Sequence, residues 1–313
     1  MRKFNMQNVF VWILPPQKGG YKWRYRGENE RVCNYLRLQI HNALDLGWPK
    51  EDIVPITNFP FEHMGVKANE VEMDVCVWSS FANRMIAVNE MIKKGIINDN
   101  FWVHDLDAYQ LVPFDFPQEC KGVSFTKHAP GRRKPQGASV FYRKDSFDIV
   151  DAMAKTIKVF KVSKEESFFP NLLREGGIKV AKRYRLREQK LAKQIEEFVA
   201  ISEKQKEELA TLMVKHKAHL LYADTSNAYF AKFEDRFGWV NWEYNLCHQR
   251  MFQKKFDKAD KPIKVVHCKL EYKNVVECFY NGVNCYNERV VTDRVGELFF
   301  LYNLLDESQR RDK

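Results

Sequence analysis

The first half of the chain alternates short apolar runs with stretches whose apolar residues recur at helical spacing. The apolar runs have the length of buried strands, and they lie at 9–14, 52–57, 75–78 and 100–104. The stretches at 30–46 and 80–94 have the spacing of amphipathic helices, and a glycine follows each of them. Strands that alternate with helices predict an α/β fold with a mainly parallel sheet flanked by helices.

The second half continues this pattern and then departs from it. Further strands are predicted at 122–126, 138–143 and 262–267, and a further helix is predicted at 147–159. The stretch 179–219 contains no glycine or proline and keeps helical spacing, apart from a break at 201–205. We therefore expect a helical hairpin at 179–221, inserted into a domain formed by 1–178 and 222–313.

The composition is that of an ordinary globular protein with an excess of positive charge. Hydrophobic residues make up 45% of the chain and charged residues 29%, which excludes a disordered protein. No apolar run reaches the roughly 18 residues that span a bilayer, so we expect a cytoplasmic protein. Seven cysteines without a Cys-x-x-Cys pair indicate reduced thiols. The formal net charge of +10 favours negatively charged partners such as nucleotides or nucleic acid.

The strand predicted at 100–104 leads directly into Asp105-Leu-Asp107. Ligands of parallel sheets bind beyond the carboxyl ends of the strands, where this pair lies. Two carboxylates at this spacing can hold one hard divalent cation, Mn²⁺ or Mg²⁺, which would neutralise charge on a leaving nucleotide diphosphate. A solvated turn can carry the same pattern. His104 is expected to point away from Asp105, because side chains alternate along a strand.

Other motifs stand in a characteristic order around this pair. Arg84 lies on the helix that precedes the Asp-x-Asp strand. The later motifs are Gln136-Gly-Ala-Ser139, Lys164-Glu-Glu-Ser-Phe-Phe169, Trp242-Glu-Tyr-Asn245 and Val265-Val-His-Cys-Lys269. In motif order and spacing the chain resembles the GT-A glycosyltransferases over roughly residues 8–270, apart from the hairpin. The resemblance implies a GT-A-like, Rossmann-type catalytic domain and the transfer of a sugar from a nucleotide-sugar, with a UDP-sugar favoured.

The resemblance also assigns roles to individual residues. Asp105, Asp107 and His267 would hold Mn²⁺ or Mg²⁺, an interpretation that suits imidazole beside carboxylates. Glu166, or else Glu165, would be the base that deprotonates the acceptor hydroxyl, although carboxylates at a helix N-terminus are also stabilised by the helix dipole. The donor would contact the Asp pair and Pro15, Tyr21, Arg24, Arg26 and Arg84.

Two basic segments predict an acidic acceptor. Residues 179–219 contain eleven basic and six acidic residues, and a second basic run separates the strands at 122–126 and 138–143. Nucleic acid is one such acceptor, because clustered cations bind phosphates. A hydroxymethylated DNA base would have to be flipped out or single-stranded to react. The candidate contacts are Arg132, Arg133, Lys134, Lys182, Arg183, Arg185, Arg187 and Lys190.

Two other interpretations stay open from the sequence. A glycosyltransferase of the same fold that acts on a glycan or a protein would use the hairpin for packing or assembly. A nucleic-acid-binding protein or a two-metal nuclease is the other alternative, and the nuclease would need further carboxylates near the pair, with its metals about 4 Å apart. The acids available for that are Asp115, Asp145 and Asp148.

Overall fold

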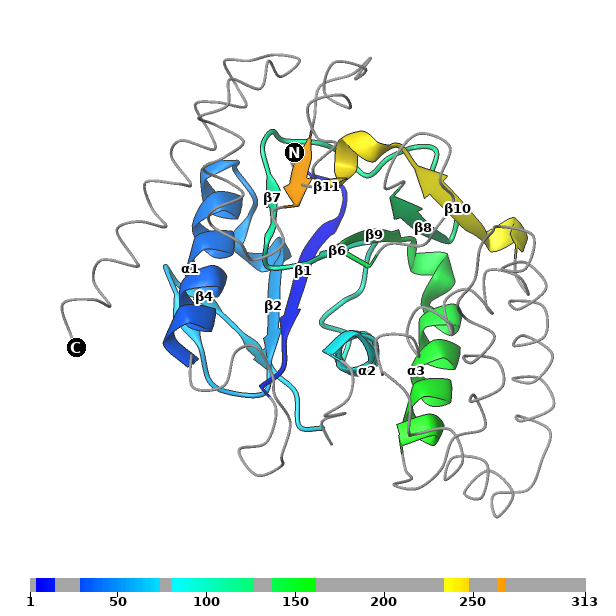
Figure 1. Cartoon of the computed structure of the whole chain (residues 1–313), viewed down its shortest axis with the longest axis horizontal. Helices are drawn as coiled ribbons and strands as arrows, with labels where there is room; N and C mark the ends of the chain where they lie inside the picture. The colour runs from blue at the N-terminus through cyan, green and yellow to red at the C-terminus, as the bar shows by residue number, and fades with distance from the viewer. Residues whose placement is uncertain are drawn as a thin grey trace, which may run out of the picture.

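A seven-stranded sheet forms the centre of the part of the chain that the structure describes (Figure 1). This computed structural model describes residues 4–14, 29–73, 80–126, 137–161, 234–247 and 264–267. The strands lie in the order β10-β8-β9-β6-β1-β2-β5. Along the chain they are β1 (Gln7–Trp12), β2 (Ile53–Thr57), β5 (Asn69–Glu70), β6 (Phe101–His104), β8 (Val123–Thr126), β9 (Ser139–Tyr142) and β10 (Phe237–Val240).

Most neighbouring strands in this sheet are parallel. β1 runs parallel to β2 and β6, β2 to β5, and β8 to β10, whereas β9 is antiparallel to both β6 and β8. Because β2 and β6 flank β1 on opposite sides, the strand order reverses at β1. Open α/β sheets bind ligands at such a switch point, outside the carboxyl ends of the strands. The ends of β1 and β6 therefore mark the expected ligand edge.

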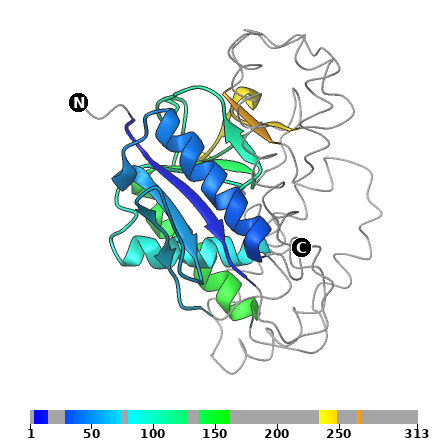
Figure 2. The same ribbon diagram turned by 90° about the vertical axis from the view of Figure 1, so that its left-hand side faces the viewer.

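Helices cover both faces of the sheet. α1 (Asn29–Asp45) packs on one face, and α2 (Ser80–Lys93) and α3 (Phe147–Lys161) pack on the other (Figures 1 and 2). Along β6, Trp102 joins the core beneath α1, while Val103 joins the core beneath α2 and α3. A strand that is buried on both faces has no polar side, which explains the continuous apolar runs in the sequence.

A second, three-stranded sheet continues from the end of β6. Its strands lie in the order β11 (Leu246–Cys247), β12 (Val265–His267) and β7 (Ala108–Gln110). β12 pairs antiparallel with β7, and His267 lies opposite Ala108 in the ladder. This pairing brings a late segment of the chain against the residues that directly follow Asp107.

The remaining described elements are short. β3 (Glu62–His63) and β4 (Val66–Lys67) form a separate hairpin. Its tip residues Met64 and Gly65 both have positive φ, as a two-residue turn of type I′ requires. Four single 3₁₀ turns occupy Lys50–Asp52, Lys144–Ser146, Glu234–Arg236 and Trp242–Tyr244.

The predicted α/β fold with a mainly parallel sheet is confirmed. The helices predicted at 30–46, 80–94 and 147–159 correspond to α1, α2 and α3, each within two residues of its predicted bounds. The predicted strands that fall in the described ranges are present as well. The strands that were not predicted are β3, β4, β5, β7, β10 and β11. The strand at 75–78 and the hairpin at 179–221 lie outside the described residues, so the division into domains stays a prediction. No helix among the described residues is long and apolar enough to cross a membrane.

Candidate metal site

The two predicted metal-binding aspartates lie on one tight turn at the end of β6. The Ala108 N–H donates to the Asp105 carbonyl (3.0 Å), which closes a four-residue turn over Asp105–Ala108. The Asp105 N–H donates to the Ala138 carbonyl at 2.9 Å, which ties the start of the turn to the residue before β9. Asp105 therefore stands at the first position of the turn and Asp107 at the third, both at the ligand edge of the sheet.

His267 reaches the same place through the small sheet. It is the last residue of β12, and its partner across the ladder, Ala108, is the residue after Asp107. The position of His267 is thus set by backbone pairing between segments about 160 residues apart in the chain.

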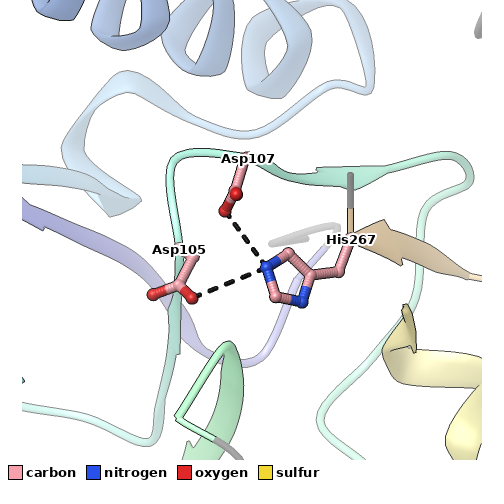
Figure 3. Close-up of side chains that lie close together, drawn as sticks. All are labelled: Asp105, Asp107 and His267. Carbon is pink, nitrogen blue, oxygen red and sulfur yellow. Dashed lines mark ion pairs between the residues drawn. The ribbon is translucent and has the colours of Figure 1, made fainter. Parts of the chain in front are cut away.

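The three side chains point toward one another (Figure 3). His267 Nε2 lies 3.3 Å from Asp107 Oδ1 and 3.8 Å from Asp105 Oδ2. One ligand atom from each residue lies within 4.8 Å of the other two, and the side chains are only 9–16% exposed. Two carboxylates and an imidazole are a donor set that suits Mn²⁺, and the oxygens suit Mg²⁺. The structure therefore brings the predicted metal ligands together, and the set fits such a cation.

Arg84 on α2 determines how Asp105 is oriented. Its guanidinium contacts Asp105 Oδ1 and the Gly137 carbonyl, so that Oδ2 is the oxygen directed at His267. Arg84 thus pairs with an aspartate of the cluster, and its predicted contact with the donor stays a prediction. The two aspartates together carry more negative charge than one guanidinium neutralises, which leaves the cluster attractive to a cation.

His104 lies beneath the turn and does not join the cluster. Its Nδ1 donates to the Asp105 carbonyl (3.0 Å), its Nε2 lies 2.8 Å from the Asn8 side-chain amide, and its ring stacks on Trp102. Burial above all, with the nearby Arg84 cation, lowers the pKa of His104 to about 3. A neutral, fully engaged imidazole supports the turn from below.

The segment that follows β1, at the same edge, is held by the side chain of the residue that directly follows β2. Asn58 Oδ1 accepts from the Leu14 N–H (2.8 Å), and Asn58 Nδ2 donates to the Leu14 carbonyl (2.9 Å). This pair fixes the point from which the chain enters the predicted donor loop.

Many predicted site residues lie outside the described ranges. These are the donor-loop candidates, the two candidate bases and all the candidate acceptor contacts: Pro15, Tyr21, Arg24, Arg26, Glu165, Glu166, Arg132, Arg133, Lys134, Lys182, Arg183, Arg185, Arg187 and Lys190. Their roles stay predictions.

The acids that a two-metal nuclease would require are elsewhere. Asp148 pairs with Arg236 and Asp145 with Arg143, while Asp115 is exposed. Within the described part of the chain, no further carboxylate belongs to the cluster of Asp105, Asp107 and His267. The described acids therefore offer one cation site rather than two.

Glu243, from the Trp242-Glu-Tyr-Asn245 motif, contacts the residue before β12 rather than the metal cluster. Its buried carboxylate lies 3.2 Å from Lys264 Nζ, and its carbonyl accepts from the Lys264 N–H at 2.7 Å. Lys264 directly precedes β12, so this pair anchors the strand that carries His267.

Comparison with known proteins gives structural likenesses only. No protein-family model matches the chain, and no curated protein matches it. A glycosyltransferase involved in the glycosylation of the major capsid of PBCV-1 is 10% identical, with a TM-score of 0.40 over 85% of this chain and 95% of that one. The galactosyltransferase LgtC, in complex with donor and acceptor sugar analogs, is 9% identical, with a TM-score of 0.40 over 94% of this chain and 95% of its own. A likeness at this TM-score establishes no activity.

Proposed function

We propose that this protein is a metal-dependent glycosyltransferase that takes its sugar from a nucleotide-sugar. The observation that carries the proposal is the cluster of Asp105, Asp107 and His267 at the switch point of a mainly parallel sheet. That edge is where open α/β sheets bind nucleotides, and a carboxylate–imidazole cluster there suits a cation-bound diphosphate. The motif order around the pair, which resembles that of GT-A glycosyltransferases, supports sugar transfer over other nucleotide chemistry.

In this proposal the three cluster residues hold Mn²⁺ or Mg²⁺. The cation, when bound, supplies neutralising charge for the diphosphate that leaves with the nucleotide. Arg84 keeps Asp105 Oδ2 directed at the cluster, and the turn keeps the two carboxylates at a fixed spacing. Glu166, or else Glu165, is the proposed base for the acceptor hydroxyl.

The proposed donor is a UDP-sugar that binds between the ends of β1 and β6. Leu14 stands at that edge, and the residues proposed to contact the nucleotide follow it in the chain. Tyr21 offers a ring that can stack on a base, and Arg24 and Arg26 offer guanidinium groups for phosphate. Pro15 begins this loop.

The proposed acceptor is acidic, and DNA with a hydroxymethylated base is the acceptor to test first. Support comes from the net charge of +10, half of which lies within 179–219. Neutralising Arg183, Arg185 and Arg187 together should reduce the salt slope of DNA binding by about three if each meets a phosphate. An unchanged slope would favour a glycan or protein acceptor and leave the basic segment a role in assembly.

The first test is calorimetric binding of UDP and of GDP, each with and without Mn²⁺. We expect tight binding of UDP that disappears in EDTA and in the Asp107→Asn variant. Asp115→Asn is the matched control, since Asp115 is an exposed aspartate outside the cluster, and it should bind as the wild type does. If the folded protein binds neither nucleotide in Mn²⁺, the proposed donor site is wrong.

A further inference from the structure

A buried glutamine on α1 holds the turn that carries the two aspartates. Gln39 is 3% exposed, and its Nε2 donates to two carbonyls, that of Leu106 at 2.7 Å and that of Ala108 at 3.1 Å. Both protons of the amide are therefore used, one on each side of Asp107. A buried side-chain amide that spans a turn in this way is costly to lose, because two carbonyls would remain without their donor.

The rest of the turn backbone is held from other directions. The Asp105 carbonyl accepts from Ala108 N–H and from His104 Nδ1, and the Asp105 N–H donates to Ala138. Gln39 supplies the contacts from the α1 side of the sheet, where the Leu106 side chain is also buried. Together these bonds leave little freedom for the peptide units that flank Asp107.

We propose that Gln39 is a positioning residue for the metal site, acting through the Leu106 and Ala108 carbonyls on the placement of Asp107 and His267. The inference rests on the proposed metal-binding function of the cluster. Ala108 lies opposite His267 in the β7–β12 ladder, so a shift of its peptide unit moves two ligands relative to one another. Groups that orient metal ligands from outside the coordination sphere typically contribute about 10–100-fold to metal affinity.

The chain provides a matched control one helical turn away. Asn42 is also a buried amide on α1, 1% exposed, and its Nδ2 donates to the Gln110 carbonyl at 3.0 Å. Gln110 lies at the far end of β7 from the turn, and Trp48 Nε1 also contacts its side chain. Asn42 thus has the same chemistry and burial as Gln39 but holds a different part of the backbone.

The experiment compares Mn²⁺ affinity in Gln39→Met and Asn42→Leu, with free Mn²⁺ followed by electron paramagnetic resonance. Thermal unfolding in EDTA measures the general loss of stability in both variants. We expect both to unfold at lower temperature, but only Gln39→Met to bind Mn²⁺ about 10–100-fold more weakly. Gln39→Asn keeps the amide donor on a side chain that is one methylene shorter, so it can be used if Gln39→Met fails to fold. Its Mn²⁺ affinity should lie between that of the wild type and that of Gln39→Met.

The outcomes separate this inference from the proposed function. If the wild type and Asp107→Asn bind Mn²⁺ equally, the metal site itself is wrong, and the role of Gln39 falls with it. If Asp107→Asn loses binding while the glutamine variants match the wild type, only the positioning role is overturned. Equal weakening in Gln39→Met and Asn42→Leu would also overturn it, because the effect would then follow from general destabilisation.

Discussion

Two arginine–carboxylate pairs in this protein have the same chemistry and very different surroundings. Arg84 and Asp105 meet at the ligand edge with side chains 9% and 16% exposed. Arg236 and Asp148 meet beside the first turn of α3 with side chains 32% and 66% exposed. The second pair is bidentate, since Arg236 Nη1 donates to Asp148 Oδ2 at 2.7 Å and Nη2 donates to Asp148 Oδ1 at 2.6 Å.

The difference shows that hydrogen-bond geometry alone does not determine how much an ion pair contributes to the free energy of unfolding. Removing charges from water is costly, so a buried pair adds little net stability, but breaking it strands a charge and is strongly destabilising. An exposed pair stays hydrated and contributes little either way. The buried pair at the site is best understood as the means of orienting Asp105, whereas the exposed pair links the turn before β10 to α3.

The largest expected effect follows from breaking the buried pair. Arg84→Met should lower the free energy of unfolding by about 3–5 kcal/mol in EDTA, because Asp105 then lacks its buried partner. Urea unfolding measures the difference, with Arg236→Met as the matched variant of the exposed pair. Adding Mn²⁺ should raise the free energy of unfolding more in Arg84→Met than in the wild type, because in the variant the cation also neutralises the unpaired Asp105. A loss below about 1 kcal/mol would show that the pair behaves like a surface pair.

The next effect concerns the aspartate that Arg84 does not contact. Asp107→Asn should change the free energy of unfolding in EDTA by less than about 1 kcal/mol, since it removes a charge from a crowded cluster rather than stranding one. With Mn²⁺ at a hundred times its dissociation constant, the wild type should gain about 2.7 kcal/mol and the variant almost nothing. Equal gains in the two proteins would place the cation elsewhere.

A smaller effect is expected at the exposed pair. Arg236→Met should cost at most about 1 kcal/mol, and the cost should shrink further in high salt, because exposed charges are screened. Urea unfolding at low and high salt tests both points. If Arg236→Met lowered the free energy of unfolding as much as Arg84→Met does, the two pairs would not differ in the way proposed.

The sequence predicted the elements whose signals are local. Apolar runs gave β1, β2 and β6, and helical spacing ended by glycine gave α1 and α2. Asp105 and Asp107 could be placed at the ligand edge because a carboxylate pair after a buried strand has a definite position in a parallel sheet. His267 entered through a family resemblance rather than through any local signal.

The parts that the sequence did not predict depend on contacts between distant segments. β7 has three residues and no visible alternation, and it forms a strand because β12 pairs with it from about 160 residues away. The contact between Arg84 and Asp105 was not predicted either, because it follows from how α2 packs on the sheet. Gln39 looks like an ordinary polar residue of a surface helix, and only the fold shows that its amide is buried against the turn.

The smallest effect is also the one with the clearest signature in pH. The hydrogen bonds from Arg236 hold the pKa of Asp148 below its ordinary value of 3.8. A carboxyl whose pKa is lower in the folded than in the unfolded state stabilises the fold above the unfolded pKa and loses that contribution as pH falls through the folded one. The stability difference between wild type and Asp148→Asn should therefore be constant near neutral pH, begin to fall near about pH 4, and vanish only below the lowered pKa that Asp148 has in the folded state. The asparagine variant still accepts a hydrogen bond but does not titrate, so urea unfolding from pH 7 downward isolates the charge. A difference that persists in acid would mean that packing around Arg236, rather than the ion pair, stabilises the junction.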